Sequence, residues 1–182
     1  SDRLRPPTAR ASSVILIDRL WPASAAIPRW LRIAVLAVAG IVLIAASARI
    51  TVPLPMVPMT LQTLAVLLVG AVYGAGLGAA TVLLYLAAGA LGLPVFAGAA
   101  SGLVALQGPT AGFLAGFVAA AALAGRFGGG GGFWRLLAVM ALGHAVIVLL
   151  GYLWLAFGFG LSAAKAWRVG VSPFLAGAVV KS

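Results

Sequence analysis

The chain has no cysteine and only two acidic residues among its 182, Asp2 and Asp18. Without cysteine, disulfides, thiolate metal sites and cysteine nucleophiles are all excluded. Without a carboxylate after Asp18, the chain also lacks the groups for carboxylate-pair hydrolysis, for a Ser-His-Asp relay and for a carboxylate-bound metal. We therefore expect that the chain is not an enzyme and holds no cofactor or metal, and a membrane enzyme is the weakest hypothesis for its function.

Charge of either sign is also scarce, since only 8% of residues are charged and 64% are hydrophobic. Soluble proteins carry about 25% charged residues, so we expect an all-α integral membrane protein. The 76 residues from Ile50 to Gly125 contain no Asp, Glu, Lys or Arg, yet a Gly/Pro-rich stretch at 92–110 interrupts them. Backbone groups freed by such a break cannot face lipid unpaired, so this loop is expected to lie in protein or line a cavity. It is the expected place for a ligand.

Charges and helix breakers divide the chain into six apolar segments, given that a helix needs about 20 apolar residues to cross a bilayer. The six expected segments are residues 30–48, 59–73, 76–92, 110–124, 136–157 and a last one that opens near residue 173. Pro53, Pro55 and Pro58 predict an extended connection between the first two segments. The short joint Gly74-Ala75 predicts an antiparallel hairpin of helices. The last segment stops at Ser182, too soon to cross, which predicts a truncated last helix.

The distribution of basic residues predicts the orientation in the membrane. The N-terminal segment and the joint between the fourth and fifth apolar segments hold eight of the twelve Lys and Arg residues: Arg3, Arg5, Arg10, Arg19, Arg29, Arg32, Arg126 and Arg135. The positive-inside rule then predicts six crossings with both termini in the cytoplasm. We expect residues 1–29 to form a basic cytoplasmic segment and residues 30–182 to form a multi-pass domain in the bacterial inner membrane. The 92–109 loop and a loop holding Lys165 and Arg168 then lie on the outer face.

The excess of positive charge does not indicate a nucleic-acid partner, because a DNA-binding domain clusters its basic residues on one folded face. Attraction to anionic membrane lipid is expected as a secondary effect. Four tryptophans near segment ends are expected to anchor at the membrane interface: Trp30, Trp134, Trp154 and Trp167.

Few side chains of the charge-free block can form hydrogen bonds with a ligand. They are Thr60, Gln62, Thr63, Tyr73, Thr81, Tyr85, Ser101, Gln107 and Thr110. An apolar pocket with a few polar groups is the usual form of a small-molecule site. Helix capping is the alternative role for Thr60 and Thr110, because each follows a proline closely.

Two titratable groups remain in the membrane region. A lone His144 is expected to be a packed, hydrogen-bonded residue. Lys181 has two open interpretations, a functional site within the membrane or a lysine that snorkels from the end of a helix. No intramembrane carboxylate is present for proton coupling, whereas sodium coordination by hydroxyls and carbonyls is left open. The glycine run 128–132 lacks the Lys and Ser/Thr of a phosphate-binding loop, so another subunit is expected to supply energy for uphill transport.

The string Val57-Pro-Met-Thr-Leu-Gln-Thr-Leu-Ala-Val-Leu-Leu-Val-Gly70 resembles the signature near the second helix of the biotin transporter family whose members are called BioY. The match continues in Leu83-Leu-Tyr-Leu86, Gly92-Leu-Pro-Val-Phe-Ala-Gly98, Leu106-Gln-Gly-Pro-Thr-Ala-Gly-Phe-Leu114, Gly143-His144 and Gly151-Tyr-Leu-Trp-Leu155. The resemblance runs from about Trp30 to the end. It implies a substrate-capturing S component of an energy-coupling-factor (ECF) importer, with six helices, an external biotin pocket, a transmembrane coupling subunit and ABC-type ATPases as partners.

The C-terminal string from Pro173 to Lys181 resembles the family's P-F-L-P-G-D-L-L-K, whose Asp and Lys contact the ureido ring of biotin. Lys181 matches that Lys, while Ala178 stands in place of the Asp and Ala176 in place of the second proline. Loss of an acceptor for a buried ligand N–H costs about 1–3 kcal/mol unless another group replaces it.

The resemblance therefore predicts high-affinity biotin binding and uptake, with the 92–109 loop closing over the vitamin. Lys181 is the site residue carried over from the motif, as a contact for the ureido or carboxylate end. The other predicted site residues are inferred from their positions: Tyr85, Phe96, Gly98, Ser101, Gly102, Gln107 and Thr110. The alternative from another class is a structural or assembly membrane protein whose loop only packs. S components of this kind meet the coupling subunit through an A-x-x-x-A pattern on the first helix, and residues 33–48 contain no strict match.

Overall fold

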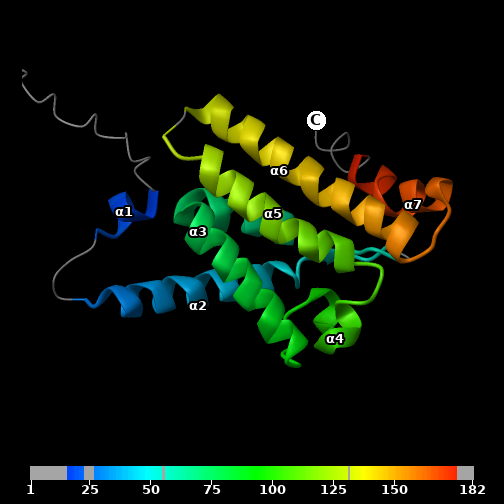
Figure 1. Cartoon of the computed structure of the whole chain (residues 1–182), viewed down its shortest axis with the longest axis horizontal. Coiled ribbons are helices and arrows are strands. Elements are labelled where there is room, and N and C mark those ends of the chain that lie inside the picture. The colour runs from blue at the N-terminus through cyan, green and yellow to red at the C-terminus, as the bar shows by residue number, and fades with distance from the viewer. Residues whose placement is uncertain (1–15, 23–26, 55, 131, 176–182) are drawn as a thin grey trace, which may run out of the picture.

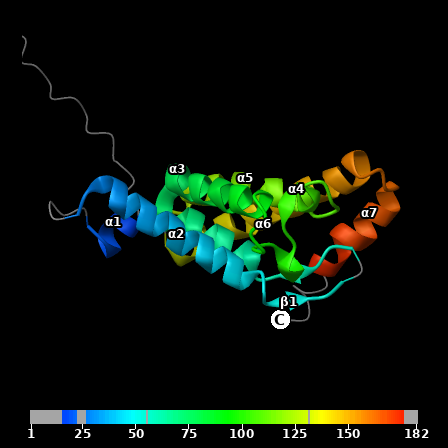
Figure 2. The same cartoon turned by 90° about the horizontal axis from the view of Figure 1, so that it is seen from below.

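The computed structural model of the protein describes residues 16–22, 27–54, 56–130 and 132–175. Its elements are α1 (Leu16–Leu20), α2 (Arg29–Ser47), β1 (Thr51–Val52), β2 (Met59–Thr60), α3 (Gln62–Ala90), the 3-10 turn η1 (Ala97–Ala99), α4 (Gly102–Ala105), α5 (Ala111–Phe127), α6 (Phe133–Leu153), the π-helix η2 (Trp154–Gly158) and α7 (Ala163–Gly170). The long helices form a bundle (Figure 1), and most short elements gather at the end away from α1 (Figure 2). We call this end the loop end and the opposite end, with Gly74 and Gly125–Gly130, the joint end.

The long helices have the length and composition of membrane spans. Among the described residues, the helices at 29–47 and 133–158 are long and apolar enough to cross a bilayer, the apolar residues 62–90 have that length in total, and α5 is a shorter apolar helix. Large apolar side chains on α6, such as Leu137, Leu142 and Leu149, are exposed. Such a surface suits contact with lipid rather than water. The expected all-α membrane class is confirmed in its coarse form, a mostly helical chain with apolar helices.

Helix α3 is two helices joined at Gly74, where φ is 83° and ψ is 169°. Glycine adopts such a positive φ without steric cost. The two halves fold back on each other, because a Cβ built on Gly78 would lie only 2.8 Å from the Cα of Gly70. The predicted hairpin of helices around the Gly74 joint is therefore confirmed.

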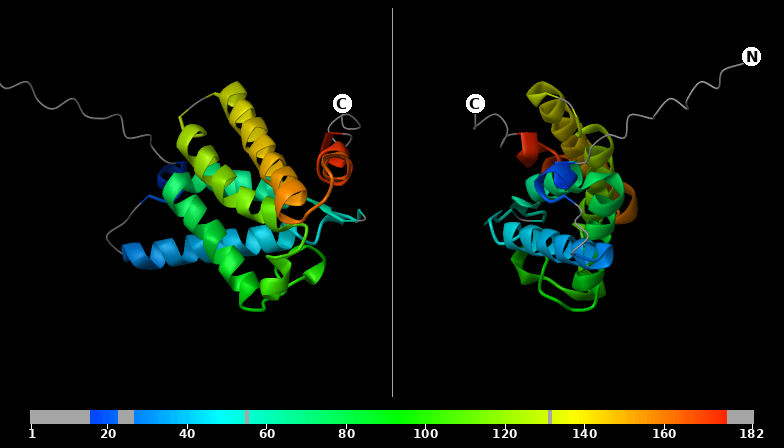
Figure 3. Two further views of the ribbon diagram at one scale, coloured as in Figure 1. Left: turned by 45° about the vertical axis from the view of Figure 1, so that its right-hand side comes forward. Right: turned by 90° about the vertical axis from the view of Figure 1, so that its left-hand side faces the viewer.

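The core forms where α5 packs between α3 and α6 (Figure 3). A Cβ built on Gly70 of α3 would lie 2.8 Å from the Cα of Ala121 in α5, and one built on Gly125 would lie 2.6 Å from the Cα of Ala75. Small residues let helix backbones approach this closely, which is how apolar helices associate without a hydrophobic driving force. The joint end is thus fixed by contact between backbones.

Helix α2 packs on α3 through its buried residues Leu36, Ala37, Gly40 and Ile44. A Cβ built on Gly40 would lie 2.6 Å from Cγ2 of Thr81. Ala37 and Gly40 therefore serve packing inside the chain, and the opposite face of α2 exposes Val38 and Val42. At its N-terminal end, Arg32 pairs with Asp18 of α1 at 2.7 Å.

The predicted extended connection at the prolines contains a short antiparallel pair, Thr51 with Thr60 and Val52 with Met59. Two local features differ from the sequence prediction. The 92–109 loop contains η1 and α4. The expected loop around Lys165 is instead the helix α7, which Ser162 caps by accepting a hydrogen bond from the backbone N–H of Lys165 at 3.4 Å. A side-chain cap of this kind satisfies a donor that a short helix would otherwise leave free.

Candidate ligand-binding site

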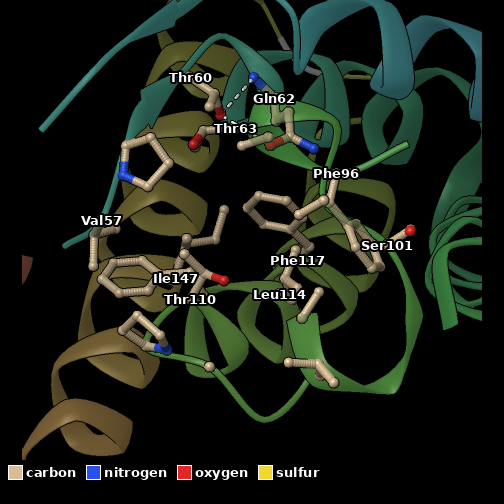
Figure 4. Close-up of a pocket in the computed structure, with 18 of the residues that line it drawn as sticks. Val57, Thr60, Gln62, Thr63, Phe96, Ser101, Thr110, Leu114, Phe117 and Ile147 are labelled. Atoms are coloured by element: carbon tan, nitrogen blue, oxygen red, sulfur yellow. Dashed lines mark hydrogen bonds between the residues drawn. The ribbon is translucent and has the colours of Figure 1, made fainter. Parts of the chain in front are cut away.

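A cavity of about 440 Å³ lies at the loop end of the bundle (Figure 4). Small-molecule sites typically measure about 300–1,000 Å³. Its lining comes from the proline connection, the start of α3, the 96–110 segment, α5, α6 and the residues after α7: Val57, Pro58, Thr60, Gln62, Thr63, Phe96, Ala97, Ala100, Ser101, Val104, Ala105, Gly108, Pro109, Thr110, Phe113, Leu114, Phe117, Ile147 and Phe174. None of these described lining residues is charged, so the cavity suits a largely apolar ligand with a few polar groups.

The polar groups of the lining are grouped rather than scattered. Thr60, Gln62 and Thr63 lie together on one side of the cavity, and Thr110 lies across from them (Figure 4). Thr60 and Gln62 are tied to each other by a side-chain hydrogen bond of 3.1 Å. Thr60 donates in that bond, so its hydroxyl can only accept from a ligand, while the hydroxyls of Thr63 and Thr110 can match ligand groups of either kind.

The aromatic wall at Phe96 is held from behind by Tyr85. The two rings meet edge to face with centroids 5.5 Å apart. The buried Tyr85 hydroxyl donates to the carbonyl oxygen of Val95 at 3.1 Å and accepts from the Gln62 amide. The Phe96 ring also covers Gly89, one turn further along α3, where it leaves no room for a Cβ. One chain of contacts therefore links the polar side of the cavity to the backbone that carries Phe96.

The structure brings three of the predicted site residues to the cavity wall: Phe96, Ser101 and Thr110. Tyr85 lies behind the wall. Gly98 and Gly102 do not line the cavity, but their positive φ angles of 66° and 78° shape the segment that covers it. Gln107 is exposed on that segment. Lys181 falls outside the described residues, and direct ligand contact by any of these residues stays a prediction.

The alternative role of helix capping has a different outcome for Thr60 and for Thr110. Thr60 accepts a hydrogen bond from the backbone N–H of Gln62 at 3.3 Å, next to the start of α3. Thr110 precedes α5 directly, yet its side chain makes no capping hydrogen bond there. The capping interpretation is therefore wrong for Thr110, whose hydroxyl borders the cavity instead.

Sequence reasoning missed most of the apolar wall. Phe113 and Phe117 lie four residues apart and so share one face of α5, a spacing that could have indicated them. Ile147 and Phe174 come from distant segments and meet the cavity only in the fold. Thr63 is one of the polar groups of the charge-free block, and only the fold shows that it lines the cavity.

The fold and the site are those of a multi-pass helical membrane protein with an apolar cavity, of the size of a small-molecule site, at one end of its bundle. The sequence model of the BioY family matches residues 19–182, and the chain belongs to that family. The predicted membership is confirmed.

Named relatives agree. A probable biotin transporter BioY of Pyrococcus horikoshii is 40% identical over 142 residues, covering 78% of this chain and 84% of that protein. Biotin transporter BioY2 of Lactococcus lactis subsp. cremoris is 34% identical over 153 residues, with 79% and 80% covered. These relatives are named as transporters, which agrees with the expectation that the chain is not an enzyme.

A solved structure has the same fold. It is the crystal structure of the S-component for biotin from an ECF-type ABC transporter, with a TM-score of 0.70 and 21% sequence identity. The similarity covers 79% of this chain and 82% of that chain.

Proposed function

We propose that this protein binds biotin in the cavity at the loop end and serves as the biotin-capturing component of an importer. One observation carries the proposal: segments of the chain that hold the BioY strings, at 57–63, 92–98 and 106–114, meet around a single apolar cavity. Membership of the BioY family, whose relatives above are named biotin transporters, supplies the ligand.

The cavity suits the chemistry of biotin. Biotin joins a fused ring system with a ureido group to an aliphatic chain that ends in a carboxylate. Phe96, Phe113 and Phe117 offer aromatic surface to the rings and the chain. The ureido group has two N–H donors and one carbonyl acceptor. The hydroxyls of Thr63 and Thr110 can accept from or donate to it, whereas the Thr60 hydroxyl already donates to Oε1 of Gln62 and can only accept. Ser101 is exposed, so we place it at the rim.

Lys181 is our proposed contact for the ureido or carboxylate end of the ligand. The described chain borders the cavity at Phe174, and Lys181 follows seven residues later in the sequence. Replacing Lys181 with Met removes the charge at similar length. We expect biotin affinity to fall by about tenfold or more, as for a lost charged hydrogen bond, with no change in unfolding temperature. Equal affinity in the variant would contradict this role.

Six crossings with both termini in the cytoplasm are the topology we propose. Arg126 lies at the joint end, where Gly125 contacts the Gly74 joint, so the positive-inside rule places this end in the cytoplasm. The cavity at the other end then opens outside. For a sixth crossing, an apolar groove of about 340 Å³ between α6 and α7 borders Phe174 and Leu175, where the described chain stops, and offers a packing surface.

We further propose that an ECF coupling subunit and ABC-type ATPases energise uptake in the cell membrane. The exposed face of α2, with Val38 and Val42, is available for a membrane partner because the small residues Ala37 and Gly40 are already buried against α3. Uptake of labelled biotin by biotin-auxotrophic cells tests this. We expect uptake to rise when the partner subunits are co-expressed, and no uptake under either condition would contradict transport.

A structural protein without a small-molecule ligand is the competing function. It predicts that purified protein takes up no biotin and that cavity substitutions change only stability. Equilibrium binding of biotin to purified protein separates the two functions. Dethiobiotin, which lacks the sulfur but keeps the ureido group, is the matched second ligand, and binding of both would indicate that the ureido group dominates recognition.

A further inference from the structure

Trp154 occupies an unusual position at the end of α6. Its sequence position predicts an interface anchor, and the residue is partly buried and begins the π-helix η2. The backbone N–H of Phe159 donates to the carbonyl oxygen of Trp154 at 2.7 Å, the i to i+5 bond of a π turn. Single π turns of this kind occur frequently at functional sites. Trp30, Trp134 and Trp167, by contrast, are exposed, and interface anchoring of the four tryptophans stays a prediction.

The indole of Trp154 reaches the cavity wall without lining the cavity. Its Nε1–H donates to the carbonyl oxygen of Gly108 at 2.9 Å. Gly108 begins a turn in which the backbone N–H of Ala111 donates to the same carbonyl oxygen at 3.2 Å. Thr110 has φ −85° and ψ −8°, as in the third position of a type I turn, and Pro109 occupies the position that proline favours. A carbonyl oxygen has lone pairs for both donors.

Two glycines let the backbone lie close to the Trp154 side chain. A Cβ built on Gly112, in the first turn of α5, would lie 2.6 Å from the carbonyl oxygen of Leu150 and 3.0 Å from Cγ of Trp154. One built on Gly158 would lie 2.7 Å from Cζ3 of Trp154. The indole ring of Trp154 therefore lies between the start of α5 and the π turn at 154–159. Its Nε1–H points at the Gly108 carbonyl of the other turn, at 108–111.

We propose that Trp154 is a positioning residue of the binding cavity, which holds the Gly108–Thr110 turn in place through its indole N–H. All three residues of that turn line the cavity. The consequence for a ligand rests on the proposed function, because it assumes that biotin occupies the cavity. Loss of the N–H donor frees this part of the wall, so bound ligand escapes faster while the encounter rate changes little.

Two substitutions separate the hydrogen bond from the packing of the ring. Trp154→Phe keeps an aromatic ring and removes the donor. Trp154→His keeps a donor, because Nε2 of histidine occupies the same place in its five-membered ring as Nε1 of tryptophan, and it removes the larger ring. Trp134→Phe is the matched control, since Trp134 is 77% exposed at the start of α6 and far from the cavity.

The first measurement needs no ligand. Amide hydrogen exchange of residues 103–112 is followed in the three variants and the unsubstituted protein. We expect the exchange rate of this segment to rise about three- to tenfold in Trp154→Phe, as for loss of one hydrogen bond. In Trp154→His we expect a rate within about twofold of that in the unsubstituted protein. Equal exchange in Trp154→Phe and the unsubstituted protein, or equal loss in both Trp154 variants, would overturn the proposal. Failure of both variants to fold would also overturn it, because packing would then explain the residue.

The second measurement is the dissociation rate of labelled biotin. We expect it to rise about three- to tenfold in Trp154→Phe and to stay close to the unsubstituted value in Trp154→His, as for the exchange rate. An unchanged dissociation rate beside increased exchange would overturn the ligand part of the proposal. If the unsubstituted protein binds no biotin, the proposed function fails, while the exchange result still decides whether Trp154 positions the turn.

Discussion

The packed glycines Gly70 and Gly125 near the joint end serve a different purpose from Gly98 and Gly102 in the 92–107 segment at the loop end. At the joint end, Gly70 and Gly125 lie where a Cβ would strike the backbone of another helix. In the 92–107 segment, Gly98 and Gly102 have open space around the Cβ position but positive φ angles. The first set allows helices to touch, and the second set allows a chain to turn over a cavity. Stability and ligand binding are thus expected to respond to different substitutions.

The largest expected effect is at the joint end. Gly70→Val places a branched side chain against the backbone of Ala121, which cannot yield as a flexible side chain can. We expect a loss of about 3 kcal/mol in the free energy of unfolding, at the upper end of overpacking effects. Thermal unfolding in detergent measures it. Gly76→Val is the control, because a Cβ at Gly76 meets nothing within 4 Å, and equal unfolding temperatures for the two variants would contradict the account.

Tyr85→Phe should affect both stability and ligand binding, because Tyr85 is buried in α3 and also packs against Phe96 in the cavity wall. Removing the hydroxyl leaves the Gln62 amide and the Val95 carbonyl without this partner. We expect a stability loss of about 1–3 kcal/mol and weaker biotin binding. Calorimetric unfolding and equilibrium binding are measured on the same sample. Tyr152→Phe is the control and should change neither quantity, and similar effects in both variants would argue against the Tyr85 contact chain.

Gly102→Ala should affect ligand binding with little effect on global stability. An L-residue at φ 78° costs about 1–2 kcal/mol, and this strain falls on the segment that covers the cavity. We expect biotin affinity to fall by roughly fivefold, since about 1 kcal/mol corresponds to that ratio. Gly132→Ala is the control, because Gly132 has an ordinary φ of −67°. A lower unfolding temperature with unchanged biotin affinity would contradict the claim that the glycines of the 92–107 segment serve ligand binding rather than stability.

The smallest effect is expected at Arg49. Its guanidinium donates to the carbonyl oxygen of Pro94 at 2.6 Å, close to Phe96, but the contact is exposed. Exposed charged contacts contribute only about 0–1 kcal/mol. Arg49→Gln should therefore change biotin affinity by about twofold or less, and Arg168→Gln should leave it unchanged. A tenfold loss in Arg49→Gln would show that the start of the 92–107 segment depends on this one contact.

The sequence predicts the helices and the region of the site better than it predicts the contacts. Absent charge and the Gly74-Ala75 joint are local signals, and both lead to the correct helical hairpin. The Gly/Pro stretch also indicates where the cavity lies. The contact of Trp154 with the cavity wall could not be predicted, because it depends on a π turn and on Gly108, which lies 46 residues away in the sequence. The helix α7 was also not predicted from sequence, although Ser162 is a favourable N-cap residue at its start.

The central claim is that biotin occupies the cavity at the loop end. Isothermal titration of purified protein with biotin tests it, alongside Ala105→Trp, which fills the cavity from α4, and Leu103→Trp, which adds a ring to the same helix at a residue 63% exposed. The account predicts one biotin per chain at micromolar affinity or tighter, unchanged in Leu103→Trp and lost in a folded Ala105→Trp. No binding to the unsubstituted protein, or full binding to Ala105→Trp, would contradict it.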